Sequence, residues 1–381
     1  MKKKLNINII SDRLAKEGYT QTSLAKKIGV SKEAVSQWLK NENLPRPDKL
    51  LLLGKLLKMK YDEMIIRIEE ANDPRVSFRL KANKKLKNED MATGRTIGKA
   101  LEKLIKYFDI ETLQTAPTLI NPKNDYEYIV DVAIELRNQI NPKNDKIVIQ
   151  EIINIYKIYK ATLIPVLWGE KQTHENAFHI LLPETMTSWV YINIDTYKYD
   201  FKFWLLHELA HILTPNVNDN FDAELFADNL AGEILCPRKQ TEKYYEKIFA
   251  HNNIQAREYE LLQISEELEV SPYTIYKRIN KYAHHNNLEV LNWGEQIGKI
   301  INNSRSVTIA TELFGDGNVS IEKYIEICEK YFKTNIFSVL IEALEENDLN
   351  AEYFKTIFNI SILEAKSIRD YLIGKKHKYS P

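Results

Sequence analysis

The sequence predicts a mostly α-helical protein of two or three domains with one small β-sheet. Apolar residues follow helical spacing through residues 6–64 and again from Thr96, whereas β-favouring residues dominate three short stretches between Ala161 and Ile194. The chain has 381 residues but only 12 Gly and 12 Pro, and 28% of its residues are charged. This composition is typical of a globular protein and excludes a disordered or collagen-like chain.

Cysteine content and hydropathy narrow the compartment in which we expect the protein. Its two cysteines, Cys236 and Cys328, are too few for a disulfide framework, and the chain does not open with the pattern of a secretory leader. The most apolar stretches, Leu50–Leu57 and Phe203–Leu213, are shorter than the roughly 18 to 20 residues that span a bilayer. We therefore expect a cytoplasmic protein without a membrane segment.

The N-terminal part is basic, although the whole chain is neutral. In residues 1–64 the Lys and Arg residues outnumber the Asp and Glu residues by 14 to 7, whereas the chain contains 53 of each kind. The remaining residues therefore contain more Asp and Glu than Lys and Arg. A basic module attached to an acidic body favours binding of a polyanion by the N-terminal part.

Residues 6–64 read as short helices separated by tight turns. Thr20 and Ser31 are suitable N-caps of two successive helices, and Gly29 suits the left-handed position between them. The small Ala25 on the inner face permits the two helices to cross closely. This arrangement predicts a helix-turn-helix.

The stretch from Thr20 to Lys40, followed by Pro45, resembles the Cro/repressor (XRE-type) family of DNA-binding domains over about sixty residues. The resemblance implies that the second helix enters the major groove of double-stranded DNA. It places Gln21, Lys27 and Lys40 at the phosphates, and Lys32, Glu33, Ser36 and Gln37 at the bases. The alternative is a helical protein-docking module with solubilising lysines. The family often has Gly after the recognition helix, where this chain has Asn41, which tolerates the left-handed conformation.

Changes in composition divide the chain into four parts. Residues 1–66 are the helix-turn-helix domain and 67–95 a basic linker, for which contact with DNA is the alternative. Residues 96–285 are an α+β domain, and 286–381 are a helical C-terminal domain. The string Ile-Asn-Pro-Lys-Asn-Asp occurs at 120–125 and again at 140–145, and both copies are typical of a turn that caps a following helix.

Residues 204–213 carry the clearest chemical motif, Trp-Leu-Leu-His-Glu-Leu-Ala-His-Ile-Leu. His207 and His211 lie four residues apart on an apolar helix, so both imidazoles can bind one tetrahedral ion, and Glu208 projects toward the open side of that ion. The alternative is a pair of core histidines. However, burying two imidazoles and a carboxylate in so apolar a helix without a metal is costly. The spacing therefore predicts a metal site.

A third ligand is expected from the next helix. Glu224 follows the second histidine by thirteen residues, and Asp228, one turn later, can accept a hydrogen bond from a ligating imidazole. Asp222, Glu233 and Cys236 are alternative ligands. Asp222 lies off the face shared with Asp228, whereas Glu233 and Cys236 occur in a segment typical of a helix end and core.

Together these residues resemble the ImmA/IrrE family of gluzincin-like zinc metallopeptidases. The similarity rests on Phe203–His211, on Glu224 with Ala227 and Asp228, and on Ala231–Pro237, and it extends over residues 126–282. It implies a zincin-like metallopeptidase fold for the α+β domain. It also implies that the protein cleaves a partner helix-turn-helix repressor in a stress or mobile-element response.

The same resemblance implies a role for each residue. His207, His211 and Glu224 hold Zn²⁺, and Glu208 takes a proton from the attacking water and returns it to the leaving amine. No donor to the oxyanion stands out. We expect an extended substrate to pair with an edge of the sheet formed by residues 161–194. The alternative function is a transcription regulator whose metal site is structural or sensory and hydrolyses nothing.

The C-terminal part of the sequence carries no catalytic grouping. Residues 260–282 have the rhythm of a second helix-turn-helix, but Glu266, Glu267 and Glu269 favour packing against the preceding domain over DNA binding. Amphipathic helices continue to about residue 375. We expect residues 286–381 either to sense a signal or to join two copies in a homodimer.

Overall fold

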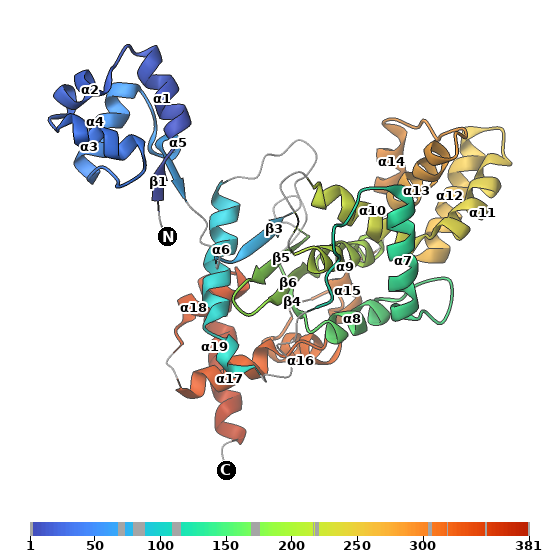
Figure 1. Ribbon diagram of the computed structural model, residues 1–381. Helices are drawn as coiled ribbons and strands as arrows, with labels where there is room; N and C mark the ends of the chain where they lie inside the picture. Colours follow the sequence, from blue (N-terminus) through green and yellow to red (C-terminus); the bar gives the residue numbers. More distant parts are fainter. Residues whose placement is uncertain are drawn as a thin grey trace. The chain divides into compact units, whose positions relative to one another are not determined.

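A computed structural model describes residues 3–67, 73–78, 88–108, 116–168, 176–215, 217, 221–303, 307–317, 319–346 and 349–379 of the chain. The chain forms two compact units, Met1–Asp73 and Pro74–Pro381 (Figure 1). Each unit has a hydrophobic core of its own.

The first unit is a bundle of short helices with a two-stranded antiparallel sheet. Its elements are β1 (Lys3–Leu5), α1 (Ile7–Lys16), α2 (Gln21–Ile28), α3 (Lys32–Leu39), α4 (Pro47–Leu57), α5 (Tyr61–Met64) and β2 (Ile65–Arg67). Leu24, Val35 and Trp38 are buried in its core. The apolar faces of α2 and α3 therefore pack as their 3.6-residue spacing predicts.

The helices α2 and α3 have the predicted caps. Thr20 and Ser31 each accept a hydrogen bond from the backbone N–H three residues on, at 3.2 and 3.1 Å, and Gly29 has a φ of 74°. Asn41 has a φ of 56°, and its side-chain amide pairs with the backbone N–H and C=O of Leu5 at 2.8 and 3.2 Å. Asn41 thus joins the end of α3 to β1, which a glycine could not do.

The second unit is built around one mixed sheet. Its strands are β3 (Arg75–Phe78), β4 (Thr162–Val166), β5 (Ala177–Leu182) and β6 (Thr187–Asn193), in the order β3-β5-β6-β4. β3 and β6 run antiparallel to β5, and β4 runs parallel to β6. Every residue of β5 and β6 is buried. The sheet is therefore covered on both faces.

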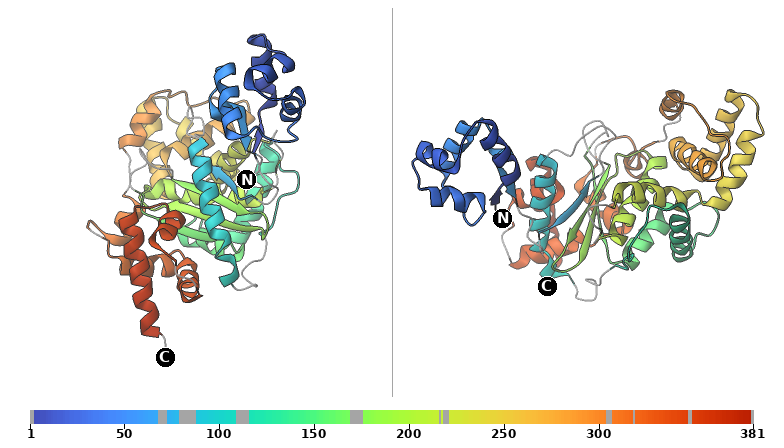
Figure 2. Two further views of the ribbon diagram at one scale, coloured as in Figure 1. Left: turned by 90° about the vertical axis from the view of Figure 1, so that its left-hand side faces the viewer. Right: turned by 45° about the horizontal axis from the view of Figure 1, so that its top comes forward.

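Helices cover the two faces of this sheet and form two cores (Figure 2). Val190 and Ile192 of β6 face the first core, whereas Trp189 and Tyr191 face the second, because successive side chains of a strand alternate. The first core contains α7 (Tyr126–Ile140), α8 (Ile149–Ile158), α9 (Lys198–Leu213), α10 (Ala223–Leu235), α11 (Arg238–Phe249), α12 (Ile254–Leu268), α13 (Pro272–His285), α14 (Gln296–Asn303) and α15 (Ile309–Phe314).

The second core lies on the other face of the sheet. It contains α6 (Asn88–Glu102), the 3-10 helix η1 (Ile105–Tyr107), α16 (Ile321–Lys330), α17 (Ile336–Glu346), α18 (Ala351–Phe358) and α19 (Ile362–Tyr379). The predicted C-terminal part, residues 286–381, is thus shared between the two cores. The helices α16 to α19 cover one face of the sheet, and α9, which carries the metal motif, packs on the other face.

Part of the predicted basic linker belongs to the second unit. Residues 75–78 form β3, and α6 begins at Asn88. The Nη1 atom of Arg75 donates a hydrogen bond to the carbonyl of Pro215 at 3.1 Å, just beyond the end of α9. The other residues of this stretch, 68–72 and 79–87, lie outside the described residues.

The two copies of the six-residue string have different roles. In the first copy, Asp125 caps α7, because its Oδ1 accepts a hydrogen bond from the backbone N–H of Tyr128 at 3.1 Å. In the second copy, Asn141 ends α7 with a φ of 49°. The helix that follows begins later, and Glu151 accepts from the backbone N–H of Val148 at 2.9 Å. The prediction that the second copy caps a following helix is therefore wrong.

The stretch 260–282, with its helix-turn-helix rhythm, packs inside the second unit. It contributes to α12 and α13, and Arg278 of α13 is buried in an ion pair with Glu233 of α10. A side chain held in this way is not free to contact DNA. Among the described helices, none is both long and apolar enough to cross a membrane.

Candidate functional site

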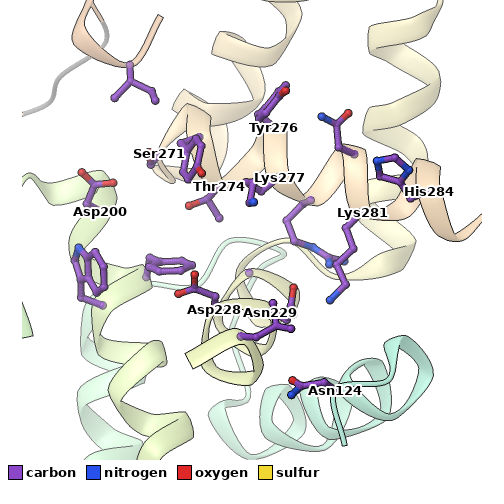
Figure 3. A pocket seen from close by; sticks show the side chains of 18 residues that line it. Asn124, Asp200, Asp228, Asn229, Ser271, Thr274, Tyr276, Lys277, Lys281 and His284 are labelled. Carbon is purple, nitrogen blue, oxygen red and sulfur yellow. The ribbon is translucent and has the colours of Figure 1, made fainter. Parts of the chain in front are cut away.

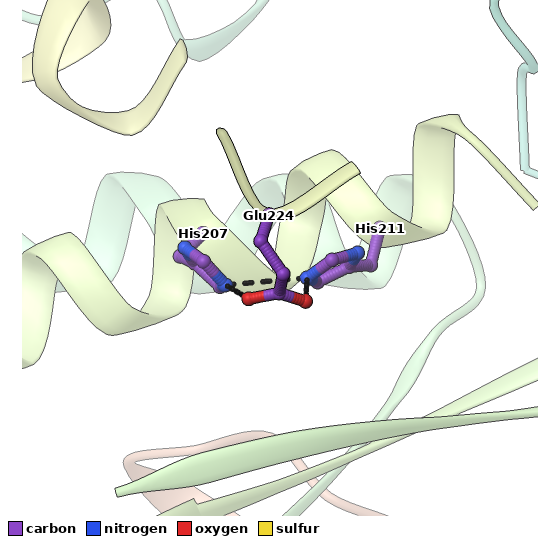
Figure 4. Close-up of side chains that lie close together, drawn as sticks. All are labelled: His207, His211 and Glu224. Carbon is purple, nitrogen blue, oxygen red and sulfur yellow. Dashed lines mark hydrogen bonds and ion pairs between the residues drawn. The ribbon is translucent and has the colours of Figure 1, made fainter. Parts of the chain in front are cut away.

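The helix α9 carries the predicted metal motif through the centre of the first core. Almost all of its residues are buried, because it lies between the sheet and the helix α10. His207 and His211 are 0% and 5% exposed, and both imidazoles project from α9 toward the carboxylate of Glu224 (Figure 4). The helix geometry places the two histidines on one face because four residues make about one turn.

Four atoms of three side chains meet at this point. The Nε2 atoms of His207 and His211 lie 3.2 Å apart. Glu224 Oε2 lies 3.4 Å from the first of these nitrogens, and Glu224 Oε1 lies 3.1 Å from the second. Among the described residues, these three form a group whose ligand atoms could hold one metal ion.

These separations fit a tetrahedral ion. In a zinc site with bonds near 2.0 to 2.1 Å, neighbouring ligand atoms are about 3.3 Å apart. The three measured distances lie within a few tenths of an ångström of that value. In addition, Glu224 Oε2 is buried, and apart from its 3.4 Å contact with His207 Nε2 it has no hydrogen-bond partner in the described part of the chain. A cation at the centre of the group would satisfy this oxygen and both imidazole nitrogens.

Asp228 contacts the ring nitrogen of His207 that does not face the other ligands. Its Oδ1 lies 3.0 Å from Nδ1 of His207, the ring nitrogen that faces away from Glu224. Burial alone would lower the pKa of His207, but the contacts with Asp228 and Glu224 outweigh burial and raise that pKa to about 9. Burial alone would raise the pKa of Glu224, but the contacts with the two histidines outweigh burial and lower that pKa to about 2. The site therefore attracts positive charge, which a divalent cation would also supply.

The predicted base, Glu208, lies on α9 between the two histidines and is 1% exposed. It adds a third carboxylate to those of Glu224 and Asp228 around two imidazoles. With both imidazoles neutral, as metal ligation requires, the group has a large excess of negative charge. This excess again favours a bound cation.

The structure adds His179, which sequence reasoning did not select. His179 is buried on β5, its Nε2 lies 3.1 Å from Ser188 Oγ, and burial together with the nearby His211 lowers its pKa to about 3. It is therefore a neutral imidazole on the sheet that faces the metal motif. No local pattern distinguishes it, because its position depends on how α9 packs on the sheet.

The alternative third ligands are engaged elsewhere. Asp222 is the N-cap of α10, and its Oδ1 accepts a hydrogen bond from the backbone N–H of Leu225 at 2.9 Å. Glu233 is paired with Arg278. The buried thiol of Cys236 lies 3.3 Å from a threonine hydroxyl. Of the candidates weighed from the sequence, Glu224 is the one that reaches both histidines.

The predicted DNA-contacting residues lie on the surface of the first unit. Ser36 is half-buried, and the others are exposed: Gln21, Lys27, Lys32, Glu33, Gln37 and Lys40. Gln21 begins α2, and four of these residues belong to α3. The second helix therefore presents polar side chains on the face opposite its buried Val35 and Trp38.

Comparison with known families identifies the first unit. Residues 10–64 match a helix-turn-helix family model, which confirms the predicted helix-turn-helix. The match indicates DNA binding and a role in the regulation of transcription. No curated protein and no solved structure shows a significant match to the chain. The resemblance of residues 126–282 to metallopeptidases stays a prediction.

Proposed function

We propose that the protein is a DNA-associated zinc endopeptidase that cleaves a partner helix-turn-helix repressor and thereby relieves repression. The observation that carries this proposal is the convergence of His207, His211 and Glu224 at tetrahedral spacing, with Glu208 beside them on α9. The helix-turn-helix supports the location of the activity at DNA.

The residues of the site suit the chemistry of peptide hydrolysis. When bound, a zinc ion supplies Lewis acidity to the water and the peptide carbonyl next to it. Glu208 would accept a proton from the attacking water and return it to the leaving amine. Asp228 would hold the Nδ1–H of His207, which leaves Nε2 free as a ligand. Three protein ligands leave one coordination position open, whereas a structural zinc site usually has four protein ligands.

The sheet offers a place for an extended substrate. Within residues 161–194 we expected an edge of the sheet, and β4 is one of its two edge strands. On the other side β5 is covered by β3, so β3 is the edge strand there. Arg75 of β3 is bonded to the segment that follows α9. A substrate strand would therefore pair with β3. His179 of β5, kept neutral by burial, would donate a hydrogen bond to the developing oxyanion.

The direct test is mass spectrometry of candidate helix-turn-helix repressors from the same genome after incubation with the protein. We expect one specific cut that disappears when a chelator is added. The substitution Glu208→Gln should leave bound zinc unchanged and abolish the cut. The matched control Glu246→Gln, on the exposed face of α11, should cleave normally.

Two results would count against this proposal. Cleavage that persists in Glu208→Gln would exclude Glu208 as the base. If zinc alters the affinity for DNA but no repressor is cut, the protein is instead a regulator with a sensory or structural metal site.

A further inference from the structure

A second site adjoins the metal centre along α9 and α10, because Asp228, which contacts His207, also lines it. A cavity of about 710 Å³ is bounded by residues of α9, α10 and α13 (Figure 3). Of the metal-centre residues, Asp228 lines it, whereas His207, His211 and Glu224 are not among the described residues of its wall. Cavities of about 300 to 1,000 Å³ are the usual size for small-molecule sites. The cavity is therefore large enough for a ligand, and it lies beside the metal position without including the three metal ligands.

Arg278 gives this cavity a buried positive charge with an unused donor. The residue is 3% exposed, its Nε donates to the carbonyl of Cys236 at 3.1 Å, and its Nη2 binds Glu233. Its Nη1 is buried and has no hydrogen-bond partner among the described residues. An unsatisfied buried guanidinium donor is costly. Because Arg278 lines the cavity, an anion bound there could accept the missing hydrogen bond.

Two lysines add to the charge at the same wall. Lys277 and Lys281 line the cavity from α13, and each ammonium group lies 5.8 Å from the centroid of a tyrosine ring. Within the described part of the chain, neither forms an ion pair with a carboxylate. Burial, assisted by the neighbouring Arg278, lowers the pKa of Lys281 to about 8. Positive charge is therefore concentrated here without full compensation. A bound anion would stabilise all three cations.

The opposite end of the cavity has a different character. Figure 3 shows the carboxylate of Asp200 on the side of the cavity away from Lys281 and His284. Trp204 lies one turn after Asp200 on α9 and also lines the cavity. A carboxylate beside an indole ring suits a planar ring that carries N–H or O–H donors. The cavity is thus basic at one end, and aromatic and acidic at the other.

We propose that this cavity binds a nucleoside phosphate. The phosphate would lie at Lys277, Arg278 and Lys281, and the base and sugar would lie toward Asp200 and Trp204. The volume corresponds to one such molecule. This inference goes beyond the proposed peptidase activity and does not depend on it, since binding is measured without cleavage.

The test is isothermal titration calorimetry on the full chain. The probes are the four common ribonucleoside 5′-monophosphates, the corresponding nucleosides, and inorganic phosphate, at constant ionic strength. We expect at least one nucleotide to bind with a Kd below about 1 mM, and its nucleoside to bind at least about tenfold more weakly. Absence of binding by all four nucleotides, or equal binding of the nucleoside, would overturn the proposal.

Matched variants locate the bound molecule. Lys277→Met and Lys281→Met should each weaken nucleotide binding by about tenfold or more, because each removes one charge from the phosphate end. Both substitutions keep a long side chain in place, and thermal unfolding checks that the fold is retained. The control Lys366→Met, at an exposed position of α19, should bind as the parent does. If neither α13 substitution weakens nucleotide binding, the nucleotide does not bind in this cavity. Phosphate bound at the metal centre instead would give that result.

Discussion

Zinc should stabilise the second unit by a large and specific amount. The two imidazole nitrogens already lie 3.2 Å apart, and each has an oxygen of Glu224 at 3.4 or 3.1 Å, so little rearrangement would oppose binding. The free energy of unfolding of this unit should therefore rise by nearly the full linkage term, which is about 4 kcal/mol when free zinc is 1,000-fold above the Kd. For a unit of this size, each kcal/mol corresponds to about 2 to 4 °C, so its Tm should rise by on the order of 10 °C.

The assay is differential scanning calorimetry of chelator-treated protein with and without zinc. Because the first unit has its own core, its transition serves as an internal reference that zinc should not move. Glu224→Gln should remove most of the shift, since a neutral amide is a poor zinc ligand. Glu246→Gln, a matched change at an exposed site, should retain it. A zinc-independent Tm in the parent protein, or a full shift in Glu224→Gln, would refute the assignment of the ligands.

Further changes test other parts of the structure. Burial lowers the pKa of Lys202 to about 8, so the unfolded chain binds more protons there between pH 8 and 10.5, and Lys202 adds stability as the pH rises. Between pH 7 and pH 10, urea unfolding of the parent should therefore show a gain about 2.5 kcal/mol larger than that of Lys202→Met. Glu233→Gln leaves the buried Arg278 without its counter-charge and should cost about 3 to 5 kcal/mol in the same assay; a loss below about 1 kcal/mol would contradict this. Lys27→Ala should weaken binding to all duplexes and reduce the salt slope by about one in fluorescence anisotropy, whereas Gln37→Ala should weaken mainly the cognate site; identical behaviour of the two would argue against the assigned roles.

Features that depend on neighbours along the chain could be predicted. The caps Thr20 and Ser31 and the left-handed Gly29 depend on the residue and on the few backbone groups beside it. The same holds for His207 and His211, because a single helix places residues four apart on one face. The predicted strands at 161–168, 177–182 and 188–194 lie close to the observed ones.

Other features could not be predicted because they join distant parts of the chain. The second copy of the repeated string follows α7 but does not cap α8, since the helix starts where packing allows and not where the string recurs. β3 arises from a stretch with the composition of a linker, because β5 offers it a free edge. His179 comes near the metal motif only through the packing of α9 on the sheet.

The sequence by itself determined the helix-turn-helix and the pair of histidines, because backbone geometry within a helix or a turn sets those spacings. The sequence favoured Glu224 as the third ligand, but only the tertiary structure brings it, and not Asp222, Glu233 or Cys236, to both histidines. It also decided that Lys277, Arg278 and Lys281 line one wall of a cavity. The physical reason is that contacts between elements depend on how whole faces pack, and no short stretch of sequence contains that information.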